Sequence, residues 1–193
     1  TKPTAPYTDM TFGMGKNGYP AICMTQLAAK MYSMWLSART GRFYRLPTEA
    51  EWVWAARYAA GPDPTRFPWG DNMPPVEVHA NYADEAAANM VPYHITGYSD
   101  NFRGPAPVAT YKENELGIFD LAGNVSEWIH DFYSLRKPTE TLTDPLGPNE
   151  GDYHVIRGSN YTHGRFSELR WTFRDYGEEA RTDVGFRIAR YVE

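Results

Sequence analysis

The clearest repeat of apolar positions in the chain lies between Thr25 and Arg39. Its members recur at the three-to-four spacing of an α-helix: Ala28, Met31, Trp35 and Ala38. Thr25 can accept a hydrogen bond from the first helical turn, and Gly41 just beyond the end suits a helix C-cap. The pattern predicts a helix over residues 25–39 that packs this apolar face into the core.

A second helix start follows Pro47. Thr48 and Glu51 have the spacing of a capping box, in which each side chain bonds to the other residue's backbone N–H. The pattern predicts a helix from about Glu49 to Arg57, with Trp52 and the alanines at 55 and 56 facing the core.

Residues 61–107 contain no long periodic segment. Prolines at positions 62, 64, 68, 74, 75, 92, 105 and 107 interrupt the region repeatedly. A compact domain rarely holds so long a loop without a function or an internal tie. A cation bound by Asn81, Asp100 and nearby carbonyl oxygens would tie the two ends of this excursion together.

The rest of the chain predicts short strands. Residues 155–157 and 185–189 read as strands that close the domain, and residues 128–133 as an aromatic-rich turn or short strand. Residues 1–20, rich in glycine and proline, are expected to form an extended lead-in to a domain over residues 21–193. The fold class is α+β: irregular and loop-rich, with two helices and short antiparallel strands.

The segment Gly117–Trp128, GIFDLAGNVSEW, is expected to begin as a short strand and has the composition of a cation-binding loop. Asp120 and Glu127 supply carboxylates, while Gly123 and Asn124 accept the positive φ of a sharp turn that directs carbonyl oxygens inward. Calcium takes six to eight oxygen ligands of this kind. A surface turn with a solvated Asp and Glu is the alternative, because the spacing is not that of an EF-hand.

Five phrases carry a resemblance to a known family: YRLPTEAEWVWAAR (residues 44–57), FPWGDN (67–72), GIFDLAGNVSEW (117–128), VIRGSNY (155–161) and VGFRIAR (184–190). In this order they resemble the formylglycine-generating enzyme, or sulfatase-modifying factor, family. The resemblance implies a loop-rich fold related to C-type lectins. It also implies that the chain lacks a β-rich segment that usually precedes this point in the family.

The resemblance implies two calcium sites, in each of which side chains and backbone carbonyls share the coordination. One site matches Asp120, Gly123, Val125 and Glu127, with the middle two using carbonyl oxygens. The other matches Asn81, Tyr82, Asp100 and Phe102, with Tyr82 and Phe102 again using carbonyls. These eight positions are the predicted metal ligands.

Catalytic members of the family bind copper through a pair of cysteines after the RGGS-like phrase. Here the matching positions hold His163 and Glu168, and Cys23 is the chain's one cysteine. Thiolates are the soft ligands that Cu(I) requires. Copper and formylglycine generation are therefore not expected.

A cleft beside these positions would be lined by polar and aromatic residues: Tyr161, His163, Glu168 and Arg170, with Arg165, Trp171 and Arg174. Such a cleft suits an acidic or peptide ligand. The alternative is that its arginines pair in a solvated network with Glu168, Asp175, Glu178 and Glu179.

We therefore predict a non-catalytic binding or structural module held together by two calcium ions, acting alone or as a subunit of a larger hetero-complex, with a protein or peptide partner. The alternative is a metal-dependent oxidase or maturation enzyme of the same superfamily that uses non-cysteine ligands such as His163. Whether the chain is an enzyme stays open at this point.

The composition of the chain excludes several classes of protein and bears on its location. The net charge of −5 and the lack of a Lys/Arg cluster argue against a nucleic-acid-binding surface. No apolar run approaches the length of a membrane span. A single cysteine rules out an intrachain disulfide. Because calcium is readily available outside the cytosol, the predicted sites favour a periplasmic or extracellular location.

Overall fold

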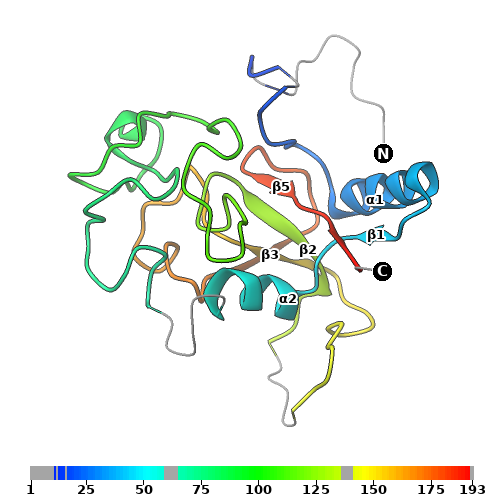
Figure 1. The fold of residues 1–193 in the computed structure, drawn as a ribbon. Coiled ribbons are helices and arrows are strands. Elements are labelled where there is room, and N and C mark those ends of the chain that lie inside the picture. Colours follow the sequence, from blue (N-terminus) through cyan, green and yellow to red (C-terminus); the bar gives the residue numbers. More distant parts are fainter. Residues whose placement is uncertain (1–10, 12, 16, 59–64, 136–140, 192–193) are drawn as a thin grey trace.

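The computed structural model describes residues 11, 13–15, 17–58, 65–135 and 141–191 (Figure 1). Most of the lead-in predicted over residues 1–20 lies outside these ranges. Helix α1 (Gln26–Thr40) is followed by the short strand β1 (Tyr44–Arg45) and by α2 (Glu49–Val53), which continues as a π-helical turn, η1 (Trp54–Tyr58). The only other helix in the described residues is the 3-10 turn η2 (Glu85–Ala87).

Six strands form two sheets among the described residues. The larger sheet has the order β4-β3-β2-β5, from β2 (Ser126–Phe132), β3 (His154–Arg157), β4 (Arg174–Gly177) and β5 (Val184–Phe186). The smaller sheet pairs β1 with β6 (Ala189–Arg190) in antiparallel fashion. Strand β3 is antiparallel to both of its neighbours, but β2 and β5 are parallel, so the larger sheet is mixed.

The two helices use opposite faces of the β2–β3 pair. Trp128 and Ile156 belong to a buried cluster with Ala29 of α1. The next residue on β2 and the preceding residue on β3, Ile129 and Val155, belong to a cluster with Trp52 of α2. This assignment follows from the alternation of side chains along a strand. Both faces of the central pair are therefore buried.

Helix α1 has the predicted caps but not the predicted buried face. Thr25 accepts a hydrogen bond from the Ala28 N–H, and Gly41 is left-handed with φ 69°. The four predicted core positions, Ala28, Met31, Trp35 and Ala38, are all exposed. The buried residues are Gln26, Ala29 and Ser33.

The physical reason is close packing with local hydrogen bonding. Ala29 and Ser33 are small enough to let the helix approach the sheet. Gln26 donates to the Ile129 carbonyl at 3.2 Å, and Ser33 donates to the Ala29 carbonyl at 3.1 Å. Because these polar groups are satisfied, their burial costs little. The prediction of a buried Met31–Trp35 face was wrong.

The second helix matches its prediction at the start. Both hydrogen bonds of the Thr48–Glu51 capping box are present, and Glu51 also forms a 2.6 Å ion pair with Arg45. Trp52 and Ala56 are buried, while Ala55 is half-buried. The regular α-helix ends earlier than predicted because the chain changes to π-helical turns at Trp54.

Residues 65–124, here called the loop region, contain no strand in their described structure, as the prolines predicted for residues 61–107. A separate core fills the region: Phe67, Ala80, Tyr82, Ile95, Tyr98 and Leu169. In the view of Figure 1, most of the loop region lies at one edge of the molecule and α1 with β1 at the opposite edge. The strand expected at the start of residues 117–128 instead begins at Ser126, after the turn.

Candidate functional site

The turn before β2 has a backbone that few residue types adopt. Asp120 and Asn124 have φ values of 63° and 86°. Contrary to expectation, Gly123 does not have a positive φ. It is needed for space instead, because a Cβ there would lie 2.8 Å from the Asn81 carbonyl oxygen. The turn is therefore pressed directly onto the start of the 81–102 excursion.

Asp120 offers one free carboxylate oxygen in this turn. Its Oδ2 accepts a 2.9 Å hydrogen bond from the Ala109 N–H. Its Oδ1 is buried without a hydrogen-bond partner. Burial raises the pKa of this carboxyl group, and the guanidinium of Arg187 partly offsets the shift. An ionised Asp120 would thus be stabilised by a nearby cation.

Glu127, the second predicted carboxylate, is already heavily engaged. Its Oε2 accepts hydrogen bonds from Trp52 Nε1 at 2.7 Å and from Arg187 Nε at 2.6 Å. Its Oε1 pairs with the other side of the same guanidinium, which also donates to the Phe119 carbonyl. Sequence reasoning missed Arg187, although it lies in the VGFRIAR phrase, because nothing local marks it as the partner of Glu127.

The second predicted ligand set comes together around Asp100. Its two carboxylate oxygens accept 2.9 Å hydrogen bonds from the N–H groups of Tyr82 and Phe102. Asp84 accepts a 2.7 Å hydrogen bond from the N–H of Asp100, which fixes the position of this segment. Burial raises the pKa of Asp100 to about 6. A nearby cation would stabilise the ionised form of a carboxyl group whose pKa is raised in this way.

Asn81 links the two sets. Its Nδ2 donates to the Gly104 carbonyl at 2.8 Å and to Asn124 Oδ1 at 3.2 Å, while its own carbonyl accepts from the Asn124 N–H. Asn81 Oδ1 is buried and has no hydrogen-bond partner. Each predicted set thus contains one buried oxygen, on Asn81 or Asp120, that no protein donor satisfies.

Carbonyl oxygens complete this picture. Within the described ranges, the carbonyl oxygens of Tyr82, Phe102 and Gly123 accept no backbone hydrogen bond. Also within those ranges, no three His, Cys, Asp or Glu side chains gather as a transition-metal centre would require. The donors are therefore hard oxygens, shared between side chains and backbone, which suit calcium.

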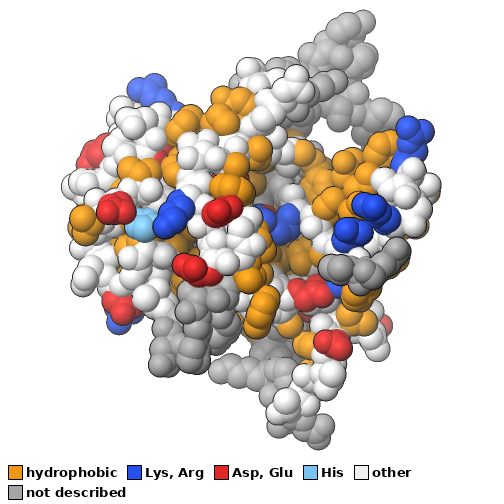
Figure 2. All heavy atoms as spheres, viewed as in Figure 1, with side chains coloured by type: hydrophobic (Ala, Val, Ile, Leu, Met, Phe, Trp, Pro, Cys, Tyr) orange, Lys and Arg blue, Asp and Glu red, His pale blue; other side chains and the backbone are white. Residues whose placement is uncertain are grey.

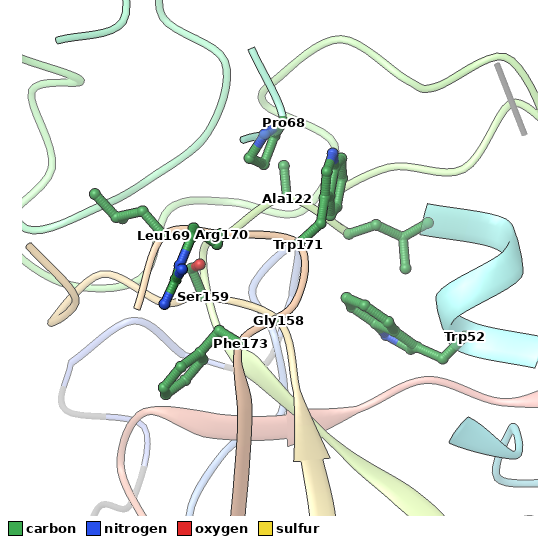
Figure 3. A pocket seen from close by; sticks show the side chains of 10 residues that line it. Trp52, Pro68, Ala122, Gly158, Ser159, Leu169, Arg170, Trp171 and Phe173 are labelled. Atoms are coloured by element: carbon green, nitrogen blue, oxygen red, sulfur yellow. The ribbon is translucent and has the colours of Figure 1, made fainter. Parts of the chain in front are cut away.

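The predicted cleft is present only in part, as a narrow crevice beside the sheet (Figure 3). Its lining comes from α2, the loop region and the segment after β3: Trp52, Pro68, Leu121, Ala122, Gly158, Ser159, Leu169, Arg170, Trp171 and Phe173. Of the seven predicted cleft residues, Arg170 and Trp171 line it, and the other five do not. In Figure 3 the indole of Trp52 and the side chain of Arg170 lie on different walls.

His163 does not line this crevice but contacts one of its lining residues. Its ring packs edge-on against Phe173 with centroids 5.0 Å apart, and its Nε2 is 3.3 Å from Asn160 Nδ2. Its Nδ1 is buried without a partner. Burial lowers the pKa of this imidazole, against the opposing effect of Glu168. His163 is therefore held neutral in the interior.

The other predicted cleft residues have local partners. Glu168 accepts the Arg165 N–H at 3.0 Å, and the Tyr161 hydroxyl reaches the Thr182 carbonyl at 3.4 Å. Arg174 forms a two-pronged ion pair with Glu49 at 2.6 and 2.8 Å. The solvated acidic network expected from the sequence is thus present only in part, and Glu49 was not foreseen in it.

These features define a loop-rich α+β domain whose irregular segment presents hard oxygen donors. A family model for the sulfatase-modifying factor enzyme 1-like domain matches residues 8–192. The chain belongs to this family, as the five sequence phrases indicated.

Relatives support the assignment. The chain is 32% identical over 178 residues to a formylglycine-generating enzyme of Mus musculus, covering 90% of the chain and 45% of the relative. It is 30% identical over 178 residues to a Bos taurus protein named inactive Cα-formylglycine-generating enzyme 2, covering 89% and 50%. The structure of PvdO from Pseudomonas aeruginosa matches with a TM-score of 0.70 at 27% identity, covering 93% of this chain and 64% of that one. The chain spans about half the length of the two curated relatives.

Proposed function

We propose that this chain is a non-catalytic binding module whose loop region is held together by two calcium ions. The observation that carries the calcium assignment is the pair of buried, unsatisfied oxygens, Asn81 Oδ1 and Asp120 Oδ1. Buried polar atoms normally have a partner. A calcium ion at each set would supply one, with carbonyls of Tyr82, Phe102, Gly123 and Val125 completing the coordination.

Glu127 can serve as a calcium ligand only if its carboxylate also keeps its ion pair with Arg187. Its carboxylate already neutralises Arg187, so a cation beside Asp120 would draw on one of its oxygens without displacing the guanidinium. The carboxylate has enough lone pairs for both contacts. We therefore expect the Asp120 set to bind calcium more weakly than the Asp100 set.

The absence of soft ligands supports a non-catalytic role. His163 and Glu168 stand at the positions where catalytic relatives carry cysteines, and His163 is buried behind Phe173. These donors do not fit the copper ion of the catalytic members. A relative whose name describes it as inactive shares 30% identity, which is compatible with this proposal.

The test combines metal content with stability. Plasma mass spectrometry on natively purified protein should find about two calcium ions per chain. Removing a ligand held at a hundredfold its Kd costs about 2.7 kcal/mol, so EGTA should lower the melting temperature by roughly 5–10 °C. Asp100→Asn should abolish most of this shift, while Asp71→Asn, which changes an exposed carboxylate, should retain it. Unchanged melting in EGTA would refute the calcium assignment.

A second candidate function rests on the unpartnered Nδ1 of His163. In this alternative the chain is an oxidase or maturation enzyme in which His163 binds a transition metal with ligands supplied by another chain. It predicts stoichiometric copper or iron, lost in His163→Ala. The same elemental analysis distinguishes the two functions, because the first predicts calcium alone.

As a binding module, the chain would have a protein or peptide partner, as a subunit of a larger assembly. No helix in the described ranges has both the length and the apolar content to cross a bilayer. We place the protein in a periplasmic or extracellular compartment, where calcium is abundant. Fractionation of the native host cells tests this location.

A further inference from the structure

The outward surface of α1 is apolar, although it faces solvent. Four long side chains follow one side of the helix and are each more than half exposed: Leu27, Met31, Met34 and Trp35. This is nearly the face that the hydrophobic pattern assigned to the core. Neither the calcium sites nor the crevice uses it.

Neighbouring rings widen this surface. Tyr32 contacts Trp35 with ring centroids 5.7 Å apart and Phe186 at 5.6 Å. Beside β1, Phe43 stacks on Tyr191 at 6.1 Å. We call these residues the α1 face: Leu27, Met31, Tyr32, Met34, Trp35, Phe43 and Tyr191. Figure 2 shows hydrophobic side chains gathered over α1, with Lys and Arg side chains near them. Single exposed apolar residues are common, but a continuous patch indicates an interaction site.

The charged residues of α1 and of the segment up to Thr48 are all basic. Residues 17–48 contain four Lys or Arg residues and no Asp or Glu, in a chain of net charge −5. Arg45 is neutralised by Glu51. In the described part of the chain, Lys30, Arg39 and Arg42 take part in no ion pair. Arg39 lies over the Trp35 ring at 5.8 Å, so its positive charge borders the apolar surface.

The composition of the α1 face is that of a protein interface. Aromatic residues, Met and Arg are enriched at such interfaces and Lys is depleted, and this face has one nearby lysine, Lys30. A second copy of the chain would place like charges opposite one another, which is unfavourable. An anionic membrane attracts clusters of basic residues, but here Arg39 and Arg45 lie over the rings of Trp35 and Tyr191.

We propose that the α1 face binds an acidic, apolar polypeptide segment of a partner protein. Its apolar side chains would cover Met31 and Trp35, and its carboxylates would pair with Arg39 and Arg42. The inference rests on the proposed role as a binding module and names the surface and the chemistry of the partner. It does not depend on the calcium sites, because the α1 face lies on the opposite edge of the molecule from most of the loop region (Figure 1).

The test is a selection from a display library of random peptides against the whole chain in calcium-containing buffer. We expect the enriched peptides to be apolar and net negative. Their affinity, measured by fluorescence anisotropy, should fall at least tenfold in the double variant Met31→Gln, Trp35→Gln, because central aromatic contacts carry most of the binding energy. Arg39→Glu with Arg42→Glu should weaken them similarly. The matched control is Val76→Gln with Leu135→Gln, which removes two exposed apolar side chains elsewhere and should change nothing.

Three outcomes would overturn the proposal. In the first, the enriched peptides lack an acidic bias or bind the Met31–Trp35 variant as well as the original chain. In the second, sedimentation reveals a dimer that the same variant abolishes, which identifies a second copy as the occupant. In the third, vesicles containing phosphatidylglycerol bind through this face while no peptide is enriched. Melting with and without EGTA on the same samples separates this result from the calcium proposal, since either can fail alone.

Discussion

The sheet and the loop region each contain a buried core, but different groups hold them together. In the β4-β3-β2-β5 sheet, backbone groups bond to one another and apolar side chains such as Trp128 fill the two faces. In the loop region, backbone turns are supplemented by polar side chains that accept hydrogen bonds from backbone N–H groups, notably those of Asp84, Asp100 and Asn124. Single apolar residues should therefore determine the stability of the sheet, and single polar residues that of the loop region.

The largest effect is expected from Trp128→Ala. Trp128 is fully buried and its Nε1 donates to the Met24 carbonyl at 2.9 Å. Removing the indole leaves a cavity and an unsatisfied carbonyl, which should lower the free energy of unfolding by about 3–5 kcal/mol. Urea denaturation followed by circular dichroism measures the change. The control Trp35→Ala, on the exposed face of α1, should lose less than about 1 kcal/mol. Similar losses in both variants would contradict the described orientation of α1.

Asn124→Ala tests the corresponding claim for the loop region. The Asn124 side chain accepts from the Ala106 N–H at 2.8 Å and donates to the Ala106 carbonyl at 3.1 Å. Leaving both groups buried without partners should cost about 2–4 kcal/mol. The matched control is Asn101→Ala, because Asn101 also has a positive φ but is exposed. Hydrogen exchange should show faster exchange at Ala106 in the first variant alone. An equal loss in both variants would mean that backbone strain, not hydrogen bonding, explains the effect.

Gly123→Ala probes the contact between the turn and the 81–102 excursion. The added methyl group would lie 2.8 Å from the Asn81 carbonyl oxygen, so the backbone must shift at a cost of about 1–3 kcal/mol. Calcium affinity, measured by isothermal titration calorimetry, should fall as well. Gly104→Ala is the control, since a methyl group added there would meet nothing within 4 Å. A silent Gly123→Ala would show that this contact is adaptable.

The smallest expected effect concerns pH at the junction of the two regions, where the His163 carbonyl accepts the Ala83 N–H. Burial lowers the pKa of His163 below the ordinary value of 6.5. The folded protein then binds fewer protons here than the unfolded chain, so stability falls as the pH drops below about 6.5, by at most ~1.4 kcal/mol per pH unit. Facing groups that modulate this are Glu168, Asp183, Asp175 and Arg181.

The measurement is the free energy of unfolding from pH 7 to pH 5. His163→Gln should flatten this dependence relative to the original chain. A slope unaffected by His163→Gln would mean that the imidazole titrates alike in the folded and unfolded states.

Local signals in the sequence identified local structure correctly. The caps of α1 and the Thr48–Glu51 capping box depend on residues three or four positions apart, so the sequence carries them completely. The buried face of α1 could not be read from local signals in the same way. Which face is buried depends on how closely the sheet approaches Ser33. Strand β2 was predicted only as an aromatic-rich turn or short strand, because Glu127 and Asp131 interrupt its apolar residues. Both acids can be buried because residues distant in the sequence donate hydrogen bonds to them.

Part of the candidate site could likewise be predicted from the sequence, and part could not. Resemblance to the family singled out eight positions, and the structure brings Asp100 together with Tyr82 and Phe102, and Asn81 with the turn that carries Asp120. Whether calcium binds there stays a prediction. The pairing of Arg187 with Glu127 could not be read from the sequence, because a guanidinium sixty positions away carries no local signal.

The parallel pairing of β2 with β5 also bears on how the chain reaches its native state. The central strand finds one neighbour, β3, soon after it is made, but the other only when the final strands have been synthesised. Contacts between such distant segments are closed at an entropic cost and slow the search for the native topology. During synthesis on the ribosome, Trp128 and the apolar edge of β2 would therefore stay accessible until Val184 emerges. This half-built sheet is the stage at which the protein would be most prone to aggregate and most dependent on chaperones.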